Sequence, residues 1–343
     1  MSSEQQTTRR IVLAARPHGE PKDSDVRFEE APLPELADGQ ALLQTLDLSL
    51  DPYMRGRMSS AKSYAAPVEI DQTMVGATVS RVLQSTDSAF APGDIVLGYG
   101  GWQTHSVEST SYLRKLDTSS VPASTALGVL GMPGFTAYSG LLTIGAPKEG
   151  ETVVVAAATG PVGSAVGQIA KIKGARAVGI AGGPDKVAYL TDELGFDAAI
   201  DHRADDFADQ LKAAVPGGID VYFENVGGKV FDAVLPRMNT YGRIPVCGLV
   251  ANYNLTELPD GPDRSGALMG QILSRSLTVR GFIQTEFAND QFDSFLRDAS
   301  GWVADGSLKY REHVVEGFDN TLDAFRGMLS GKNFGKTVVR IAE

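Results

Sequence analysis

The sequence predicts an α/β protein in which a barrel-like β domain is joined to a doubly wound, six-stranded parallel sheet. Three observations support this fold class. Short strand-like segments separated by turns, with little helical periodicity, fill residues 11–120. From residue 123 onward, buried strand-like runs alternate with helical segments, as in parallel βαβ units. The length of 343 residues is also long for one hydrophobic core, so we expect two domains.

The first part of the chain is expected to be antiparallel. Strands are predicted at residues 11–15, 40–48, 73–83 and 95–97. The segment Ala91-Pro92-Gly93-Asp94 predicts the turn before the last of these strands. Arg9-Arg10 precede an apolar run, as in an export signal, but five apolar residues are too few for such a signal. An opening strand is the better interpretation.

The second part of the chain supplies the parallel sheet. Its predicted strands are residues 152–158, 175–181, 198–201, 219–225, 243–249 and 277–283. The helices predicted between them are residues 163–173, 184–194, 205–214, 229–236 and 263–274. A helical stretch at 123–144, interrupted at Gly131–Gly134, precedes the sheet, and a helix at 291–304 follows it. Six strands with five crossovers form a doubly wound sheet.

The tail of the chain returns to a strand, a helix and a strand, at residues 310–315, 322–330 and 336–341. It could extend the parallel sheet or rejoin the β domain. We expect the second, because six strands already complete the doubly wound sheet. The predicted domains are therefore residues 1–125 together with 308–343, and residues 126–307.

Residues 152–167 predict a dinucleotide site. Their continuous apolar run breaks at Gly160, after which apolar residues recur at helical spacing. A buried strand that enters a helix through a glycine turn holds a dinucleotide's pyrophosphate at the helix N-terminus. We expect Gly160 to permit the turn, Gly163 to let backbone approach phosphate, and Gly167 to let the helix pack on the sheet. Ala158 replaces the first of the usual glycines, and an ordinary strand–turn–helix connection is the alternative.

The residues after the second predicted strand favour NADP(H) over NAD(H). In NAD enzymes, an acidic side chain about 20 residues past the glycine turn binds the ribose hydroxyls. Here Gly182-Gly183 stand at the strand tip, which leaves room for a 2′-phosphate, and Lys186 supplies a positive charge nearby. Asp185 is the discordant residue, and we interpret it as an acid favoured by the dipole at the start of a helix.

Residues that could bind zinc are few. Cys247 is the only cysteine, so the chain can form neither an internal disulfide nor a four-cysteine zinc site. The four histidines lie far apart in the sequence, at His18, His105, His202 and His313. We therefore expect metal-free chemistry in a reducing, cytoplasmic compartment.

The formal net charge of −11 disfavours nucleic acid and anionic membranes as partners, and no apolar run approaches the roughly 18 residues of a membrane span.

The expected absence of zinc restricts the reaction. Oxidation of an alcohol by hydride removal needs a stabilised alkoxide, which zinc usually supplies in two-domain dehydrogenases. Reduction of the C=C bond of an enone is less demanding, because one or two hydrogen-bond donors can stabilise the charge that develops on the enolate oxygen. A tyrosine or water can then supply the proton.

Several short motifs occur in order along the chain. They are Asp51–Arg57, Gly131–Tyr138, Ala158–Gly163, Glu224–Gly228, Arg243–Leu249, Tyr253-Asn254, Gly261–Arg264 and Gly331–Lys336. Together they resemble the zinc-independent medium-chain dehydrogenase/reductase family, in its double-bond reductase branch of curcumin, prostaglandin and alkenal reductases. The resemblance covers nearly the whole chain after residue 10. It implies a GroES-like, partly open β-barrel catalytic domain, a Rossmann domain, NADPH as cofactor and a homodimer.

The resemblance also implies a set of cofactor contacts. Lys186 would meet the 2′-phosphate, Asn225 would bond a ribose, and Asn333 would reach the cofactor from the tail. His202 stands where mammalian relatives commonly carry a tyrosine, and a surface residue after the third strand is the alternative interpretation. The full predicted set is Thr136, Gly160, Pro161, Val162, Gly163, Gly183, Lys186, His202, Asn225, Cys247, Gly248, Leu249, Tyr253, Phe282, Ile283 and Asn333.

The substrate pocket that the resemblance implies is formed by Tyr53, Tyr64, Met132 and Tyr253. Tyr253 resembles the family tyrosine that hydrogen-bonds the developing enolate, so it is the main predicted catalytic group, with Tyr64 as the second. The predicted substrate is an α,β-unsaturated ketone or aldehyde, with curcumin-like diarylheptanoids as one example. Quinone reduction on the same scaffold and a non-catalytic NADPH-binding protein are the alternatives.

Overall fold

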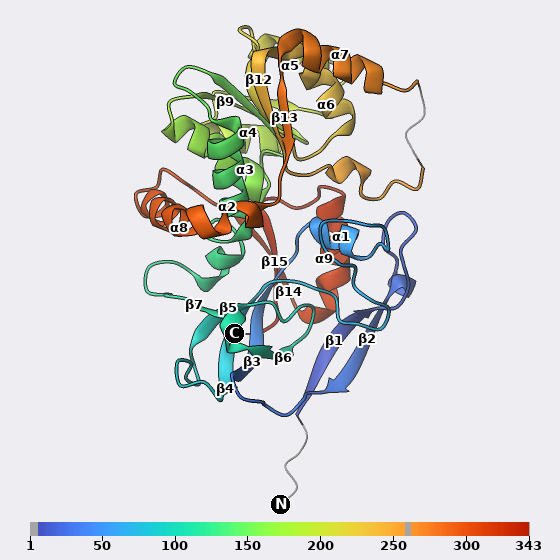
Figure 1. Ribbon diagram of the computed structural model, residues 1–343, viewed down its shortest axis with the longest axis vertical. Coiled ribbons are helices and arrows are strands. Elements are labelled where there is room, and N and C mark those ends of the chain that lie inside the picture. The colour runs from blue at the N-terminus through green and yellow to red at the C-terminus, as the bar shows by residue number, and fades with distance from the viewer. Residues whose placement is uncertain (1–5, 258–261, 343) are drawn as a thin grey trace, which may run out of the picture. The chain divides into compact units, whose positions relative to one another are not determined.

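The structure is a computed structural model that describes residues 6–257 and 262–342. The chain divides into two compact units, the first made of residues up to 127 together with those from 312 onward, and the second of residues 128–311 (Figure 1). Gly261, which belongs to one of the motifs, lies outside the described residues.

A single sheet forms the centre of the second unit. Within the described residues it has six parallel strands, in the order β10-β9-β8-β11-β12-β13. The strands are β8 (Thr152–Ala156), β9 (Arg176–Ala181), β10 (Ala198–Asp201), β11 (Ile219–Phe223), β12 (Met238–Val246) and β13 (Thr278–Gly281). The direction in which successive strands are added reverses between β8 and β11. The predicted doubly wound parallel sheet is therefore confirmed.

Helices cover both faces of this sheet. They are α2 (Met132–Ser139), α3 (Pro161–Ile172), α4 (Pro184–Asp192), α5 (Phe207–Ala214), α6 (Gly228–Val234), α7 (Ser265–Arg275) and α8 (Ala288–Ala304). Val178 and Ile180 of β9 belong to a buried cluster with side chains of α5, α6 and α7. Between them, Gly179 points to the other face, where an added Cβ would lie 2.7 Å from Leu190 of α4. In the described ranges, no helix combines the length and the apolarity needed to cross a bilayer.

The helical stretch predicted over residues 123–144 differs from the structure in its detail. Residues 123–127 form a 3-10 turn, α2 begins at Met132, and a π-helical turn over Gly140–Gly145 continues it. The Gly131–Gly134 segment is therefore the start of a helix and not an interruption of one. The physical reason is that Pro133 has no N–H to donate and so suits the first helical turn.

The first unit contains a mixed sheet with the strand order β14-β15-β3-β4-β5-β7 and with β6 paired to β3. The strands are β3 (Gln40–Ser49), β4 (Thr78–Ser85), β5 (Ile95–Gly98), β6 (His105–Ser109), β7 (Arg114–Lys115), β14 (Glu312–Glu316) and β15 (Lys336–Arg340). Only β14 and β15 pair in parallel. Among the described residues no ladder joins β14 to β7, so the sheet stays open, in agreement with a partly open barrel. Because β15 pairs with β3, the tail belongs to this unit.

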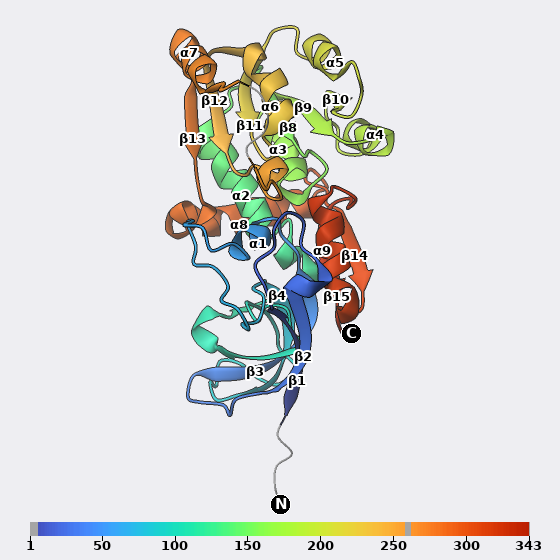
Figure 2. The same cartoon turned by 90° about the vertical axis from the view of Figure 1, so that its right-hand side faces the viewer.

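A two-stranded sheet and two helices complete the first unit. They are β1 (Thr7–Leu13), β2 (Val26–Pro32), α1 (Tyr53–Arg57) and α9 (Thr321–Leu329). Helix α9 lies alongside β14 and β15 (Figure 2). Phe325 of α9 meets Trp102 edge to face, with ring centroids 5.4 Å apart, and both side chains are fully buried. Burial of this apolar surface holds α9 and the tail against the sheets.

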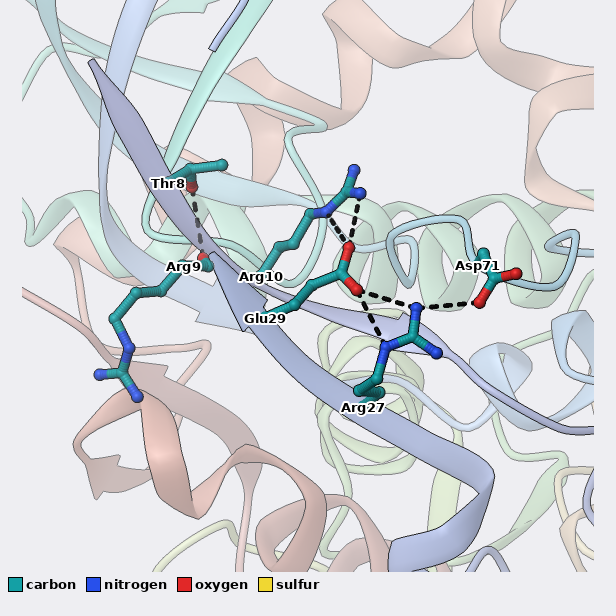
Figure 3. A network of polar contacts seen from close by, with 6 residues as sticks. All are labelled: Thr8, Arg9, Arg10, Arg27, Glu29 and Asp71. Carbon is teal, nitrogen blue, oxygen red and sulfur yellow. Dashed lines mark hydrogen bonds and ion pairs between the residues drawn. The ribbon is translucent and has the colours of Figure 1, made fainter. Parts of the chain in front are cut away.

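Ion pairs link the surface of β1 and β2 to the loop after α1. Glu29 of β2 accepts hydrogen bonds from Arg10 at 2.6 Å and from Arg27 at 2.8 Å, and Arg27 also donates to Asp71 at 2.9 Å (Figure 3). Water screens charges at such partly exposed sites, so ion pairs of this kind contribute little to folding. The buried apolar cluster that contains Trp102 and Phe325 contributes more to the stability of this unit.

Candidate active site

The turn between β8 and α3 bends at a residue other than the predicted glycine. Ala157 adopts a left-handed backbone conformation with φ +51°, whereas Gly160 has φ −74°. The left-handed residue of this turn is therefore Ala157, while at Gly160 an added Cβ would lie 3.2 Å from the carbonyl oxygen of Ala157. Gly163 is needed for close approach, because a Cβ there would lie 2.4 Å from the carbonyl oxygen of Ala157. Pro161 begins α3, and among the described residues no side chain forms a hydrogen bond that caps its N-terminus, as in helices that accept an anion at this end.

Gly167 lets α3 pack on the sheet, as the glycine spacing predicted. The ring of Phe196 lies between the helix and the sheet at this point. A Cβ at this position would lie 1.9 Å from the ring of Phe196, which follows α4. Phe196 also reaches Gly179 of β9, where an added Cβ would lie 3.0 Å from its ring. Helix α3 is therefore held on this face of the sheet across the Phe196 ring.

Basic side chains gather where β9 and β10 end. Gly183, with φ +97°, precedes α4, and Lys186 lies in the first turn of that helix. A Cβ on Gly182 would lie 2.8 Å from Nε of Arg203 and 2.9 Å from Nε2 of His202, so a larger residue there would displace these two side chains. Burial lowers the pKa of Lys186, and the nearby charge of Arg203 lowers it further. The structure thus brings Lys186 and His202 into one basic group.

Arg203 belongs to this group but is absent from the predicted set. Asp201, the last residue of β10, accepts a hydrogen bond from the backbone N–H of Arg203 at 2.8 Å, which shapes the turn after the strand. Lys229 of α6 is close enough for its charge to lower the pKa of His202, after burial as the larger cause. A signal was present, because Arg203 follows the third predicted strand, and the carboxyl ends of adjacent parallel strands meet at one edge of a sheet. Several cations around one point suit a phosphate.

Asn225 ties two strand ends together at the point where the strand order reverses. It follows β11, and its Nδ2 donates a hydrogen bond to the carbonyl oxygen of Ala156 at the end of β8, at 2.9 Å. Ligands of open α/β sheets bind outside the carboxyl ends of the strands at this position. The contact between Asn225 and a ribose stays a prediction.

The loop after β12 is attached to the turn after β11. Cys247 and Gly248 donate their backbone N–H groups to the carbonyl oxygen of Glu224, at 2.9 and 3.2 Å. A Cβ on Gly248 would lie 3.2 Å from the hydroxyl oxygen of Tyr253, so the predicted residues 247–249 and Tyr253 form one loop. Burial raises the pKa of the Cys247 thiol to about 12, with the negative charge of Glu224 as the second cause. The thiol is therefore no nucleophile near neutral pH.

The other predicted residues of the second unit lie in α2 and after β13. Thr136 is buried, and its hydroxyl donates to the carbonyl oxygen of Met132 one turn earlier, at 2.8 Å. Phe282 is also buried and meets Phe223 edge to face, with centroids 6.1 Å apart, so it is part of the core of this unit. Ile283, the next residue, is half-buried. Their contacts with cofactor or substrate stay predictions.

The tyrosines predicted for the substrate pocket form part of the first unit, except for Tyr253. Tyr53 begins α1, and burial, followed by the charge of Asp51, raises the pKa of its hydroxyl. Tyr64 and Tyr99 act electrostatically on the same hydroxyl, and each is 63% exposed. Tyr99 was not predicted. Its local sequence pattern does not indicate a site residue, because only the tertiary structure brings Tyr99 near Tyr53.

A buried ion pair joins the tail to the segment that carries Tyr53. Nζ of Lys336, the first residue of β15, lies 2.6 Å from Oδ1 of Asp51, and the two residues are 2% and 4% exposed. The other carboxylate oxygen of Asp51 accepts a hydrogen bond from Ser49. Asn333 precedes this pair in the tail, and its Nδ2 donates to the carbonyl oxygen of Gly335 at 2.9 Å. The predicted cofactor residue of the tail is thus close in sequence to the ion pair.

The residues present do not fit a zinc centre. The described ranges contain no group of three or more His, Cys, Asp or Glu side chains placed to hold a metal ion. The thiol of Cys247, which would have to ionise to bind zinc, has a raised pKa.

Comparison with known proteins identifies relatives over the whole chain. Residues 9–116 match the family described as the N-terminal domain of oxidoreductase, and residues 161–300 match the one described as zinc-binding dehydrogenase. The chain is 55% identical over 342 residues to the NADPH-dependent curcumin reductase of Escherichia coli strain K12, which covers 100% of this chain and 99% of that protein. It is 43% identical over 326 residues to prostaglandin reductase 1 of Rattus norvegicus, covering 94% of this chain and 95% of that protein. The solved structure of CurA from Vibrio vulnificus in complex with NADPH superposes with a TM-score of 0.94 at 53% identity, covering 98% of this chain and 99% of that one.

Proposed function

Because the chain belongs to the medium-chain dehydrogenase/reductase family, in its double-bond reductase branch, we propose that it catalyses NADPH-dependent reduction of the C=C bond of α,β-unsaturated ketones and aldehydes. The observation that carries this proposal is the full-length similarity to the NADPH-dependent curcumin reductase. The expected substrates are enones, including curcumin-like diarylheptanoids.

The basic group at the ends of β9 and β10 supports NADPH as the cofactor. His202 and Arg203 lie close to Gly182, where an NAD enzyme would carry an acid for the ribose hydroxyls, and the charge of Arg203 acts on Lys186 in the first turn of α4. A 2′-phosphate placed there would compensate the repulsion between the two cations. The uncapped N-terminus of α3 would take the pyrophosphate through its first-turn amides, with residues 160–163 as its contacts.

Tyr253 is the proposed main catalytic group. Bound NADPH supplies the hydride that is added to the β-carbon of the enone. The Tyr253 hydroxyl stabilises the charge on the enolate oxygen by donating a hydrogen bond, with Tyr64 as the second proposed group. Tyr53 and Met132 stay in the predicted substrate set, and a tyrosine or water supplies the proton to the α-carbon. Tyr253→Phe is expected to lower kcat on an enone about 10²-fold while NADPH still binds, and an unchanged kcat would remove this role.

A substrate panel tests the proposed function against its alternatives. The protein is mixed with NADPH and, separately, with a trans-2-enone, curcumin and a quinone, and the loss of NADPH absorbance is followed. Turnover of the enones supports the proposal. Turnover of the quinone alone would make the protein a quinone oxidoreductase, and NADPH binding without any turnover would make it a non-catalytic binding protein.

A second copy of the chain is the proposed partner, in a homodimer. Strand β13 is at the edge of the parallel sheet, and all of its residues are exposed. On α7, Met269 and Leu273 are 62% and 82% exposed. An uncovered sheet edge next to exposed apolar side chains is typical of an interface between copies. Leu273→Glu is expected to convert dimers to monomers in light scattering, and a wild-type protein that is monomeric would contradict the proposal.

The proposed location is the cytoplasm. The single cysteine is consistent with a reducing compartment, since no internal disulfide can form. The formal net charge of −11 supports a small-molecule substrate over nucleic acid or an anionic membrane as partner. Fractionation of cells that express the tagged protein tests the proposed location. Recovery of the protein with the membrane or outside the cell would contradict a cytoplasmic location.

A further inference from the structure

Glu224 is a buried carboxylate to which the proposed reaction assigns no role. It follows β11 and is 1% exposed. Its Oε1 accepts hydrogen bonds from the backbone N–H groups of Val226 and Gly227, at 2.6 and 2.8 Å, and from the hydroxyl of Tyr222 at 3.1 Å. Its Oε2 is buried and accepts no hydrogen bond from the described residues. A buried carboxylate is costly to maintain, so one that mainly binds backbone amides points to a specific task.

The two amides that Glu224 binds belong to a tight turn. Gly227 and Gly228 both have left-handed backbones, with φ +78° and φ +56°, and α6 begins at the second of them. The two amides precede α6, so neither has a partner within the helix, and the carboxyl group of Glu224 accepts the hydrogen bonds of both. The Glu224 side chain therefore shapes the turn that leads from β11 into α6. Asn225 is inside this turn.

The backbone of the same turn also carries the loop after β12. The carbonyl oxygen of Glu224 accepts from Cys247 and Gly248, that of Asn225 accepts from Val250 at 3.2 Å, and that of Val226 accepts from Ala251 at 3.0 Å. Tyr253 follows directly, with its N–H donating to the carbonyl oxygen of Val250 at 3.3 Å. A displacement of the turn would therefore move the Asn225 amide and the Tyr253 hydroxyl together.

We propose that Glu224 is a positioning residue for hydride transfer, which acts by holding the turn from which both Asn225 and the Tyr253 loop are placed. This inference rests on the proposed function, because Asn225 and Tyr253 are its proposed cofactor and substrate contacts. Displacements of about 1 Å can cost about 10²-fold in rate when reacting groups must be aligned. The required property of Glu224 is the place of its oxygen and not its charge.

Two conservative variants separate position from charge. Glu224→Gln keeps an acceptor oxygen at the same chain length and removes the charge. Glu224→Asp keeps the charge and withdraws the oxygen by one methylene. Tyr222→Phe is the matched control, since it removes the third hydrogen bond to Oε1 without touching the turn amides.

The readouts are chosen so that loss of stability cannot imitate the expected result. They are kcat on a trans-2-enone, the primary isotope effect on kcat with NADPH deuterated at the transferred position, the Kd of NADPH from its fluorescence, and the melting temperature. Glu224→Asp is expected to lower kcat about 10²-fold, to raise the isotope effect because hydride transfer becomes slower than product release, and to weaken NADPH binding. Glu224→Gln and Tyr222→Phe should stay within about threefold of the wild type in kcat.

The opposite pattern overturns the inference. An impaired Gln variant beside a normal Asp variant would assign the role to charge, and equal behaviour of the two variants would assign no role to position. A wild-type isotope effect and Kd in Glu224→Asp, with only the melting temperature lowered, would leave Glu224 a purely structural residue. Failure of the wild type to reduce any enone would instead contradict the proposed function, and the NADPH Kd of the variants would still test the role of the turn.

Discussion

Asp51 in the first unit and Glu224 in the second are both almost fully buried, but they are satisfied by different partners. Asp51 lies 2.6 Å from the ammonium group of Lys336, which cancels its charge. In the described part of the chain, Glu224 is bound by a tyrosine hydroxyl and two backbone amides, which solvate its charge without cancelling it. Burial accordingly raises the pKa of Glu224. The first unit uses a charge to fasten two segments, whereas the second uses the oxygen of a buried carboxyl group to shape a turn.

The largest loss of stability is expected from breaking the buried ion pair between Lys336 and Asp51. Lys336→Met leaves the Asp51 carboxylate buried without its cation, so the free energy of unfolding should fall by about 3–5 kcal/mol in urea titration. Adding Asp51→Asn should restore part of this loss, because the uncompensated charge is then removed. A loss no larger in Lys336→Met than in Arg243→Met, which breaks a less buried pair with Glu151, would show that burial of the pair is not what matters.

A second effect concerns the basic group in the second unit. Lys186→Ala should raise the KM for NADPH about 10–100-fold relative to that for NADH, the range expected for one hydrogen bond between charged groups. Steady-state kinetics with both cofactors measures it. Lys171→Ala, which removes a lysine paired with Asp197 on the surface of α3, is the matched control and should leave the ratio unchanged. An equal rise for both cofactors would remove the role of Lys186 in recognising the 2′-phosphate.

The raised pKa of Glu224 predicts that the stability of the protein depends on pH. Because the native pKa of Glu224 is raised above its ordinary value of 4.5, the folded state holds this proton more tightly than the unfolded state does. The contribution of Glu224 to stability therefore falls as pH rises from the ordinary value through the raised one. The melting temperature of the wild type relative to Glu224→Gln should decrease over that range and level off beyond it. A difference that does not change with pH would contradict the raised pKa, because it would mean that Glu224 has the same pKa in the folded and unfolded states.

The smallest effect is expected on the surface. Arg27→Met breaks the pairs with Glu29 and Asp71, but water screens these exposed charges, so the midpoint of urea unfolding should stay within experimental error of the wild type. A shift as large as that of Lys336→Met would show that the network in Figure 3 stabilises the β1–β2 sheet after all.

Local patterns predicted the elements of the second unit closely. Strand β10 has the predicted bounds of residues 198–201, and α4 begins at the predicted residue, because apolar runs and Pro at a helix start are local signals. The bend at Ala157 was not predictable in this way. A left-handed backbone at a residue other than glycine is imposed by the surrounding structure and has no signature in its own side chain.

The sequence supplied a set of candidate site residues, whose contacts with cofactor and substrate stay predictions. The glycine spacing identified residues 160–167, and the glycines after the second strand indicated NADPH. Arg203 was missed because its importance depends on β10 lying next to β9. The sequence presents Glu224 only as one residue of the Glu224–Gly228 motif, since no spacing rule reveals that its carboxyl group holds a turn and, through that turn, the loop after β12.

The sequence by itself determined the class of the fold and the class of cofactor, because both depend on periodicity and on residues close together in the chain. The tertiary structure alone decided which charges meet. Lys336 and Asp51 are 285 residues apart in sequence, and only the pairing of β15 with β3 makes them neighbours. Burial then sets the effect of each charge on stability. The free-energy cost of a buried charge depends on the groups that surround it in space and not on its neighbours in the sequence.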